Sequence, residues 1–260
     1  MRIPAVTADR PLIRIIPRLD IKGENVIKGV HLEGLKVVGK PGELARRYYD
    51  DGADEIVYMD VVASLYGRNN ILEKVEEAAG AIFVPLTVGG GIRSIKDIVA
   101  ALRSGADKVA LNTAATAAPD FLAEASRAFG SQCIVLSVEA KRRGEGQWEA
   151  LTDNGRERTG LDVLDWVARA EALGVGEILL TSVDREGTQK GFDVALARAV
   201  RARVSVPVIV CGGAGTPDDV AALINDADCD AVGIASLFHY DIAPIPALKA
   251  AMTERGVTVR

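Results

Sequence analysis

The sequence has few of the residues that build metal centres or disulfide frameworks. It contains three cysteines and two histidines in 260 residues. Cys133, Cys211 and Cys229 follow no C-x-x-C spacing, and we therefore expect no zinc site and no other bound metal. Each cysteine lies in or beside an apolar run, which indicates a reduced thiol that packs as a small hydrophobic residue. We also expect no organic cofactor.

Long apolar runs and clusters of positive charge are missing as well. No run approaches the roughly 18 apolar residues of a membrane span, and the N-terminus has no signal-peptide core. The formal net charge of −5, without a Lys/Arg run, argues mildly against nucleic acid as a partner. With 48% hydrophobic and 26% charged residues, the composition is typical of a soluble globular protein. These features predict a cytoplasmic enzyme or binding protein.

What the chain does contain is a regular alternation of short apolar segments and longer amphipathic ones. A nearly continuous apolar segment predicts a strand covered on both faces, as in a parallel sheet with helices outside. Eight such strands favour a single (β/α)8 TIM barrel over a doubly wound open sheet, and 260 residues is close to the roughly 250 of that fold. The predicted strands are residues 12–19, 55–59, 82–88, 108–111, 133–138, 177–180, 206–211 and 231–235. The predicted helices include residues 41–51, 94–104, 161–173, 194–202, 217–225 and 245–254.

The two halves of the chain resemble each other at a nearly constant distance. Residues 52–56 recur as 174–178, 89–91 as 212–215, 107–109 as 230–232, and 20–22 as 139–141. We therefore predict an α/β domain built from two half-barrel repeats, at about 11–130 and 131–260, with residues 1–10 as an N-terminal extension. The repeat places Asp20 and Glu139 at equivalent ends of two strands, on opposite sides of the barrel mouth.

Two glycine clusters predict a pair of phosphate-binding sites. Residues 88–91 and 211–213 each close a strand just before a helical segment. Glycine lets backbone N–H groups approach an anion closely, and a helix N-terminus favours negative charge. Two sites facing each other across a barrel indicate an elongated ligand with a phosphate at each end, whereas tight turns without a ligand are the alternative. The predicted phosphate-binding residues are Gly90, Gly91, Asn112, Thr113, Gly212, Gly213, Ala235 and Ser236.

Carboxylates at the strand ends are the candidate acids and bases. Asp20 and Glu139 each close an apolar strand, where a charge is costly unless it is solvated or paired. A carboxylate that only binds a loop amide is the alternative for either residue alone. Further strand ends carry Asp60, Asp184 and Glu186. Each of them is either a catalytic residue or a residue that positions the catalytic groups. Long loops at 22–39 and 141–160 are expected to form its walls, and Lys28 in the first is either a phosphate ligand or a solvated lysine.

A second charged set lies at the opposite ends of the strands. Its members stand at strand beginnings, so we expect them to ring the floor of the barrel, where stability is the usual role. From spacing alone, a plug of salt bridges is the favoured interpretation. The set is Arg14, Glu55, Lys108 and Glu177.

These residues together carry a family resemblance. From Arg14 to Arg260 the chain resembles the cyclase subunit of imidazole glycerol phosphate synthase, a lyase of histidine biosynthesis. The segments that carry it are 14–17, 19–20, 52–55, 85–93, 105–109, 112–115, 129–135, 176–182 and 212–215. The resemblance implies an enzyme that receives ammonia through the barrel from a docked glutaminase subunit, in a heterodimer. It implies conversion of a two-phosphate ribulosyl aminoimidazole intermediate to imidazole glycerol phosphate and aminoimidazole carboxamide ribotide.

The resemblance also assigns roles to individual residues. Asp20 and Glu139 fall where the family has its catalytic carboxylates, and Asp107 falls at a contact with the glutaminase. The floor set matches the family's charged ammonia gate at all four positions, which overturns the interpretation as a mere plug. The expected substrate-binding residues further include Lys28, Thr181, Glu186 and Gly187.

The chain departs from the family pattern at several mouth positions. Glu139 and Glu186 stand where the family has aspartate, and one methylene moves a carboxylate by about 1 Å, which can cost on the order of a hundredfold in rate. Arg18, Val62 and Cys211 replace a cysteine, a threonine and a serine. A paralogous ammonia-using subunit that serves amidation of a surface-polysaccharide sugar is therefore the main alternative. A sugar-phosphate isomerase of the sister half-barrel family would not need the floor set, and a non-catalytic docking subunit would not need the carboxylates.

Overall fold

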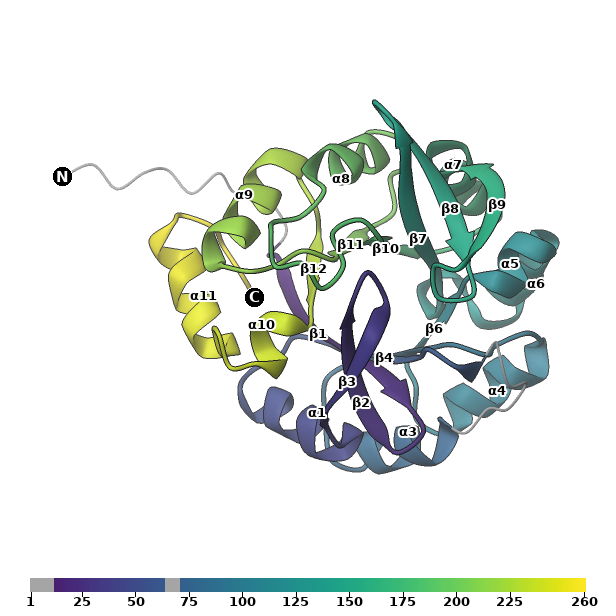
Figure 1. Cartoon of the computed structure of the whole chain (residues 1–260). Coiled ribbons are helices and arrows are strands. Elements are labelled where there is room, and N and C mark those ends of the chain that lie inside the picture. The colour runs from purple at the N-terminus through teal and green to yellow at the C-terminus, as the bar shows by residue number, and fades with distance from the viewer. Residues whose placement is uncertain (1–11, 64–70) are drawn as a thin grey trace.

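The computed structural model, which describes residues 12–63 and 71–260, is a closed barrel of parallel strands surrounded by helices (Figure 1). Each barrel strand pairs with two neighbours, and the last pairs with the first, Arg14 opposite Ala231. The predicted (β/α)8 barrel is confirmed, and the alternative prediction of a doubly wound open sheet is wrong. The barrel strands are β1 (Arg14–Lys22), β4 (Ile56–Asp60), β5 (Leu86–Gly89), β6 (Lys108–Leu111), β7 (Ile134–Gly144), β10 (Glu177–Ser182), β11 (Val208–Cys211) and β12 (Ala231–Ile234).

Helices cover the outside of the barrel. The long ones are α1 (Pro41–Asp50), α3 (Leu72–Ala79), α4 (Ile95–Arg103), α6 (Asp120–Phe129), α7 (Val163–Ala172), α8 (Val194–Arg201), α9 (Pro217–Ala227) and α11 (Ile245–Glu254). The short ones are α5 (Thr113–Ala117), α10 (Ser236–His239) and the 3-10 turn η1 (Ser131–Cys133). Helices α3 and α6 were not predicted from the sequence. Neither helix begins with a side-chain cap, the start signal that marks α4, α7, α8 and α9.

A β-hairpin follows the first strand of each half. β2 (Asn25–Val30) and β3 (Glu33–Gly39) follow β1, and β8 (Gln147–Thr152) and β9 (Glu157–Asp162) follow β7. The sequence of the second segment predicts a hairpin from the spacing of Gly144, Gly146 and Gly155, whereas the first was expected only as a long loop. The β2–β3 hairpin lies over the barrel opening in Figure 1, and the N–H of His31 at its tip donates to the carbonyl oxygen of Glu186.

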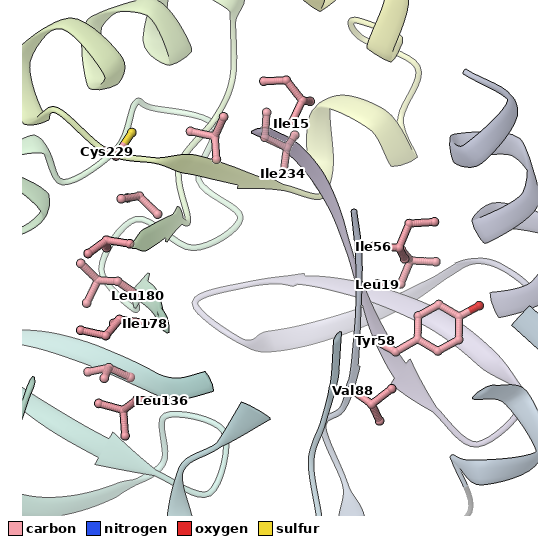
Figure 2. Packing of buried hydrophobic residues seen from close by; sticks show 14 of the residues in the cluster. Ile15, Leu19, Ile56, Tyr58, Val88, Leu136, Ile178, Leu180, Cys229 and Ile234 are labelled. Carbon is pink, nitrogen blue, oxygen red and sulfur yellow. The ribbon is translucent and has the colours of Figure 1, made fainter. Parts of the chain in front are cut away.

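The strands alternate between two apolar clusters because successive side chains of a strand point to opposite faces. On β1, Ile15 and Leu19 pack outward against the helices, as Figure 2 shows for the larger cluster. Ile16 points inward and is fully buried in the second cluster inside the barrel. The inward positions of β1 are therefore Arg14, Ile16, Arg18 and Asp20, which puts a charge at the floor, in the middle and at the mouth.

Two further predictions concern the boundaries within the chain. The predicted extension, residues 1–10, lies outside the described residues, and the boundary between half-barrels near residue 130 stays a prediction. In the ranges 12–63 and 71–260, no helix has the length and apolar character needed to cross a membrane.

Candidate active site

Asp20 lies at the barrel mouth between two cations. Its Oδ1 accepts a hydrogen bond of 2.9 Å from Nε of Arg18, and Nζ of Lys28 lies 4.0 Å from Oδ2. Burial raises the pKa of this carboxyl, but the charges of Arg18 and Lys28 outweigh burial and leave the pKa below its usual value. Asp20 is therefore ionised at neutral pH.

Glu139 lies on the equivalent position of β7 in a different environment. Its Oε2 accepts hydrogen bonds from the N–H of Gly155 at 2.8 Å and from Nδ2 of Asn112 at 3.1 Å. Burial raises the pKa of Glu139 to about 7, against the opposing influence of Arg18 and the Gly155 N–H. Near neutral pH, one carboxyl of the mouth is thus an anion and the other carries a proton for part of the time. Such a pair suits general acid–base chemistry.

The raised pKa of Glu139 predicts a pH-dependent stability. The folded protein holds this proton more tightly than the unfolded chain does. The contribution of the Glu139 proton to the free energy of unfolding is therefore complete below pH 4.5 and is lost as the pH rises through about 7. The loss amounts to about 3 kcal/mol for this shift. Glu139→Gln keeps a neutral acceptor and removes the titration, so the stability of the variant relative to wild type should rise between pH 5 and pH 8. Guanidinium unfolding at both pH values measures this, and a difference independent of pH would contradict it.

The first predicted phosphate site is an open cavity of ≈ 390 Å³ that reaches from the first glycine cluster to Glu139. It brings together Gly90, Gly91, Asn112 and Thr113, as the strand ends predict, together with Asp60. Burial raises the pKa of Asp60, whose Oδ1 accepts from the N–H groups of residues 62 and 63. Asp60 therefore shapes the loop that bounds the cavity.

The second predicted site is nearly filled by the chain itself. The space between its walls is ≈ 10 Å³, which is about the room that one water needs. Lys28 makes an ion pair with Glu186 here, so both side chains are already engaged. Thr181 lies beneath the site, where its Oγ1 accepts a hydrogen bond from Arg18, and its role in substrate binding stays a prediction. The predicted residues that border the space are Lys28, Glu186, Gly187, Gly212, Gly213, Ala235 and Ser236.

The glycines of both clusters have a second reason to be glycine. A Cβ on Gly90 would lie 2.1 Å from the carbonyl oxygen of Asp60, and one on Gly213 would lie 2.2 Å from that of Gly191. Both residues also have positive φ, at 92° and 112°. The positive φ values fit the tight turns considered as the alternative, and the close packing of neighbouring loops requires glycine at these positions whether or not an anion binds.

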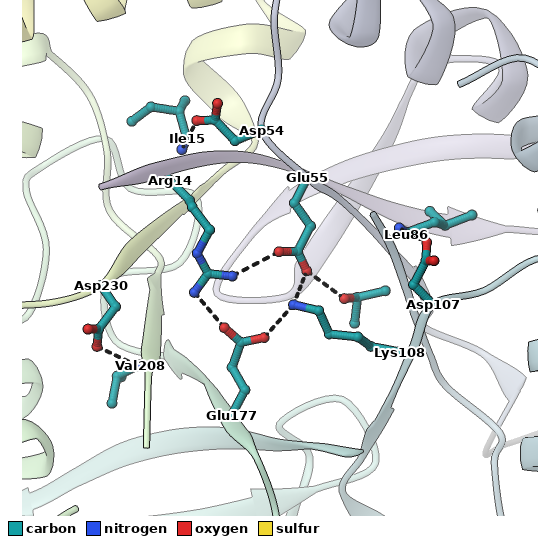
Figure 3. Close-up of polar contacts among 11 residues, drawn as sticks. Arg14, Ile15, Asp54, Glu55, Leu86, Asp107, Lys108, Glu177, Val208 and Asp230 are labelled. Atoms are coloured by element: carbon teal, nitrogen blue, oxygen red, sulfur yellow. Dashed lines mark hydrogen bonds and ion pairs between the residues drawn. The ribbon is translucent and has the colours of Figure 1, made fainter. Parts of the chain in front are cut away.

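At the opposite end of the barrel, four charged side chains close a ring (Figure 3). Arg14 contacts Glu55 at 2.9 Å and Glu177 at 2.5 Å, and Lys108 contacts the same two carboxylates at 2.7 Å each. All four carboxylate oxygens are therefore engaged. Thr87, which the sequence analysis missed, adds a hydrogen bond of 2.8 Å to Glu55. The ring closes the barrel floor as the strand positions predict.

Aspartates beside the ring bind backbone groups of neighbouring strands. Asp54, Asp107 and Asp230 accept from the N–H groups of Ile15, Leu86 and Val208, at 2.7, 2.8 and 2.9 Å (Figure 3). Asp107 is nevertheless exposed on the floor side. The expected contact with a partner at Asp107 stays a prediction.

Comparison with known proteins decides the family. Residues 14–244 match the family described as histidine biosynthesis protein. The chain belongs to this family. It is 62% identical over 203 residues to imidazole glycerol phosphate synthase subunit HisF of Legionella pneumophila, covering 78% of this chain and 96% of that protein. It is 51% identical over 254 residues to the same subunit of Mycobacterium tuberculosis, strains ATCC 25177 / H37Ra and CDC 1551 / Oshkosh, covering 95% of both chains. The predicted resemblance and the assignment as an enzyme are confirmed.

The positions that were expected from the sequence to depart from the family pattern include four that border the two predicted phosphate sites. Arg18, Glu186 and Cys211 all border the second site, and Glu139 borders the first. Burial raises the pKa of the Cys211 thiol, which disfavours the thiolate that binds metals. In the described parts of the chain, no group of three or more His, Cys, Asp or Glu side chains is placed to hold a metal ion. None of the HisF relatives above is named for sugar amidation or isomerisation.

Proposed function

We propose that this chain is the cyclase subunit of an imidazole glycerol phosphate synthase, a lyase that uses ammonia from a separate glutaminase. The observation that carries the proposal is the division of the barrel into two chemically different ends. Asp20 and Glu139, with unequal proton affinities, lie at the mouth. A closed ring of four charges lies at the floor. The names of the HisF relatives support the same assignment.

The substrate of this proposal is the two-phosphate ribulosyl aminoimidazole intermediate. One phosphate enters the open cavity beside Gly90 and Thr113, and the other binds beside Gly212 and Ser236. The second phosphate needs room, so Lys28 must exchange Glu186 for the incoming anion. Such an exchange keeps the ammonium paired, which avoids the cost of a buried and unpaired charge.

Between the two sites, the carboxylates divide the proton transfers. Ammonia attacks the ketone carbon of the ribulosyl group, whose oxygen leaves as water, and the new nitrogen then closes the imidazole ring as the bond to the aminoimidazole nitrogen breaks. Asp20 is ionised and accepts a proton from the attacking nitrogen, whereas Glu139 is the proton donor to the aminoimidazole nitrogen that leaves. The products are imidazole glycerol phosphate, aminoimidazole carboxamide ribotide and one water. In this assignment Arg18 and the Gly155 N–H hold the two carboxylates in position.

Ammonia reaches the mouth through the barrel. Above the ring lies a layer of apolar side chains that excludes ions but not a small neutral molecule, and it includes Ile16, Val57, Val135, Leu179 and Ile209. The partner glutaminase docks on the floor face, where a depression of ≈ 440 Å³ surrounds Arg14, Lys108 and Glu177. Docking opens the ring, and the heterodimer thereby couples glutamine hydrolysis to cyclisation.

The division of labour gives a direct test. In the described residues, His31 contacts the carbonyl oxygen of Val183 and His239 contacts Tyr48, so neither histidine forms a nucleophilic pair with a cysteine. The purified chain should therefore convert the substrate with ammonium salts, faster at raised pH where more ammonia is neutral, and should not use glutamine. Turnover with glutamine by the single chain would contradict the proposal. Growth of a histidine auxotroph that lacks the cyclase, when this chain is expressed in it, is the test of substrate identity.

A further inference from the structure

Arg18 is a cation buried in the middle of the barrel. Its side chain starts on β1 and crosses the interior to β10, with which β1 does not pair. Nε donates to Asp20 at 2.9 Å and Nη1 donates to Oγ1 of Thr181 at 2.7 Å. Only 3% of the residue is exposed. The guanidinium is therefore held from two strands in one place.

Arg18 also lines the second anion site, together with Gly212 and Ser236. A guanidinium has five N–H donors, of which Asp20 and Thr181 take one each. The sulfur of Cys211, a weak acceptor that borders the same space, also accepts from the Arg18 side chain. Donors of Arg18 thus remain for an oxygen that enters the site from the mouth.

The charges around the site show why a fixed cation matters there. Lys28 and Arg18 are balanced by Glu186 and Asp20, so the four side chains together carry no net charge. Without Arg18, an entering phosphate would meet two carboxylates and a single lysine in a buried space. A buried anion needs paired donors to offset its lost hydration.

We propose that Arg18 is a binding residue of the second anion site that selects a terminal phosphate, donating to its innermost oxygen while keeping Asp20 in place. Lys28 is the mobile donor of the site, because it must leave Glu186, and Arg18 is the fixed one. The identity of the substrate rests on the proposed function, but anion binding by Arg18 does not. The site so defined takes a phosphate monoester, whose charged oxygens accept from both cations, in preference to a neutral hydroxyl group.

The test uses inorganic phosphate as the probe, by calorimetric titration of the intact chain. Wild type should bind two phosphates, and Arg18→Gln should weaken one of them about tenfold or more, the usual value of a hydrogen bond between charged groups. The site beside Gly90 is the internal reference. Arg18→Lys, which keeps the charge but not the fork, should bind more weakly than wild type and more tightly than Arg18→Gln. Lys190→Gln removes an exposed cation from the same loop as Glu186 and should change neither affinity.

A second measurement separates binding and positioning from a structural role. In Arg18→Gln the closest cation of Asp20 is gone, so the acid limb of the kcat/KM profile should move to higher pH, with a raised KM. If both phosphate affinities of Arg18→Gln or of Arg18→Lys equal those of wild type, the inference is overturned even if the cyclase is active. Loss of one phosphate in a chain without cyclase activity would support the inference and contradict the proposed function. If Arg18→Gln does not fold, Arg18→Lys alone decides between these outcomes.

Discussion

Asp20→Asn is expected to lower ammonium-driven turnover by about a thousandfold or more, within the range of general acid–base catalysis. An amide has nearly the shape of the carboxylate but can neither take up nor release the required proton. The change also leaves Arg18 and Lys28 without an anion that lies 2.9 and 4.0 Å away. The measurement is kcat with saturating ammonium for wild type and variant.

The control for this substitution is Asp241→Asn. Asp241 is an exposed aspartate with φ of 52°, a conformation that asparagine also adopts, and its ion pair with Arg47 is at the surface. It should retain wild-type turnover. Asp20 is not a catalytic acid or base if the Asp20→Asn protein melts like wild type and keeps more than about a tenth of the wild-type turnover. A loss of turnover that small is far below the expected range.

The floor ring is expected to couple glutamine hydrolysis by the partner to cyclisation by this chain. Glu177→Gln removes the charge that binds both cations, so Arg14 and Lys108 are left to share Glu55. With the glutaminase present, the ratio of glutamine-driven to ammonium-driven turnover should fall about tenfold, equivalent to ~1.4 kcal/mol in the barrier. Ammonium salts reach the mouth from solution and bypass the floor, so their rate should change much less.

Thr87→Val is the matched variant, because it removes one hydrogen bond to Glu55 and none of the four charges. It should shift the ratio only slightly. If Glu177→Gln lowers glutamine-driven and ammonium-driven turnover equally, the role of the ring is purely structural. Breaking a buried ion pair costs on the order of 3 kcal/mol, so thermal unfolding of both variants must accompany the rates.

The barrel and its repeat could be predicted because both follow from spacing along the chain. A nearly continuous apolar strand is stable only where other parts of the protein cover both of its faces, as in the wall of a barrel. The repeat indicates that both halves of the chain contribute the same number of such strands. The β2–β3 hairpin could not be predicted in the same way. Its turn is made by His31 and Leu32 with positive φ, at 51° and 64°, where residues with branched or bulky side chains are uncommon.

The site was predictable as a set of residues but not as a set of contacts. Strand ends of a parallel barrel meet at one mouth, so Asp20 and Glu139 had to be neighbours of the glycine clusters. The ion pair of Lys28 with Glu186 joins strand β2 of the first half to the loop after β10 in the second half, and it depends on how the hairpin folds over the mouth. No sequence spacing encodes that, and so the difference between an open and a filled anion site was not foreseen.

One irregularity of the repeat has a steric cause. Asp54, Asp107 and Asp230 stand before their strands and bind a neighbouring backbone N–H, but Gly176 occupies the position that corresponds to Asp54. A Cβ on Gly176 would lie 2.2 Å from the carbonyl oxygen of Ser131. The η1 turn thus excludes any side chain here, and the aspartate pattern ends for lack of space.

The floor ring also constrains how the chain can be assembled from parts. Arg14, Glu55 and Lys108 belong to the first half of the chain, and Glu177 is the contribution of the second. Two copies of the first half would bring together four cations and two carboxylates, and two copies of the second would bring carboxylates alone. Neither homodimer can rebuild a neutral ring. Fragments cut near residue 130 should therefore recognise the unlike fragment in preference to their own kind.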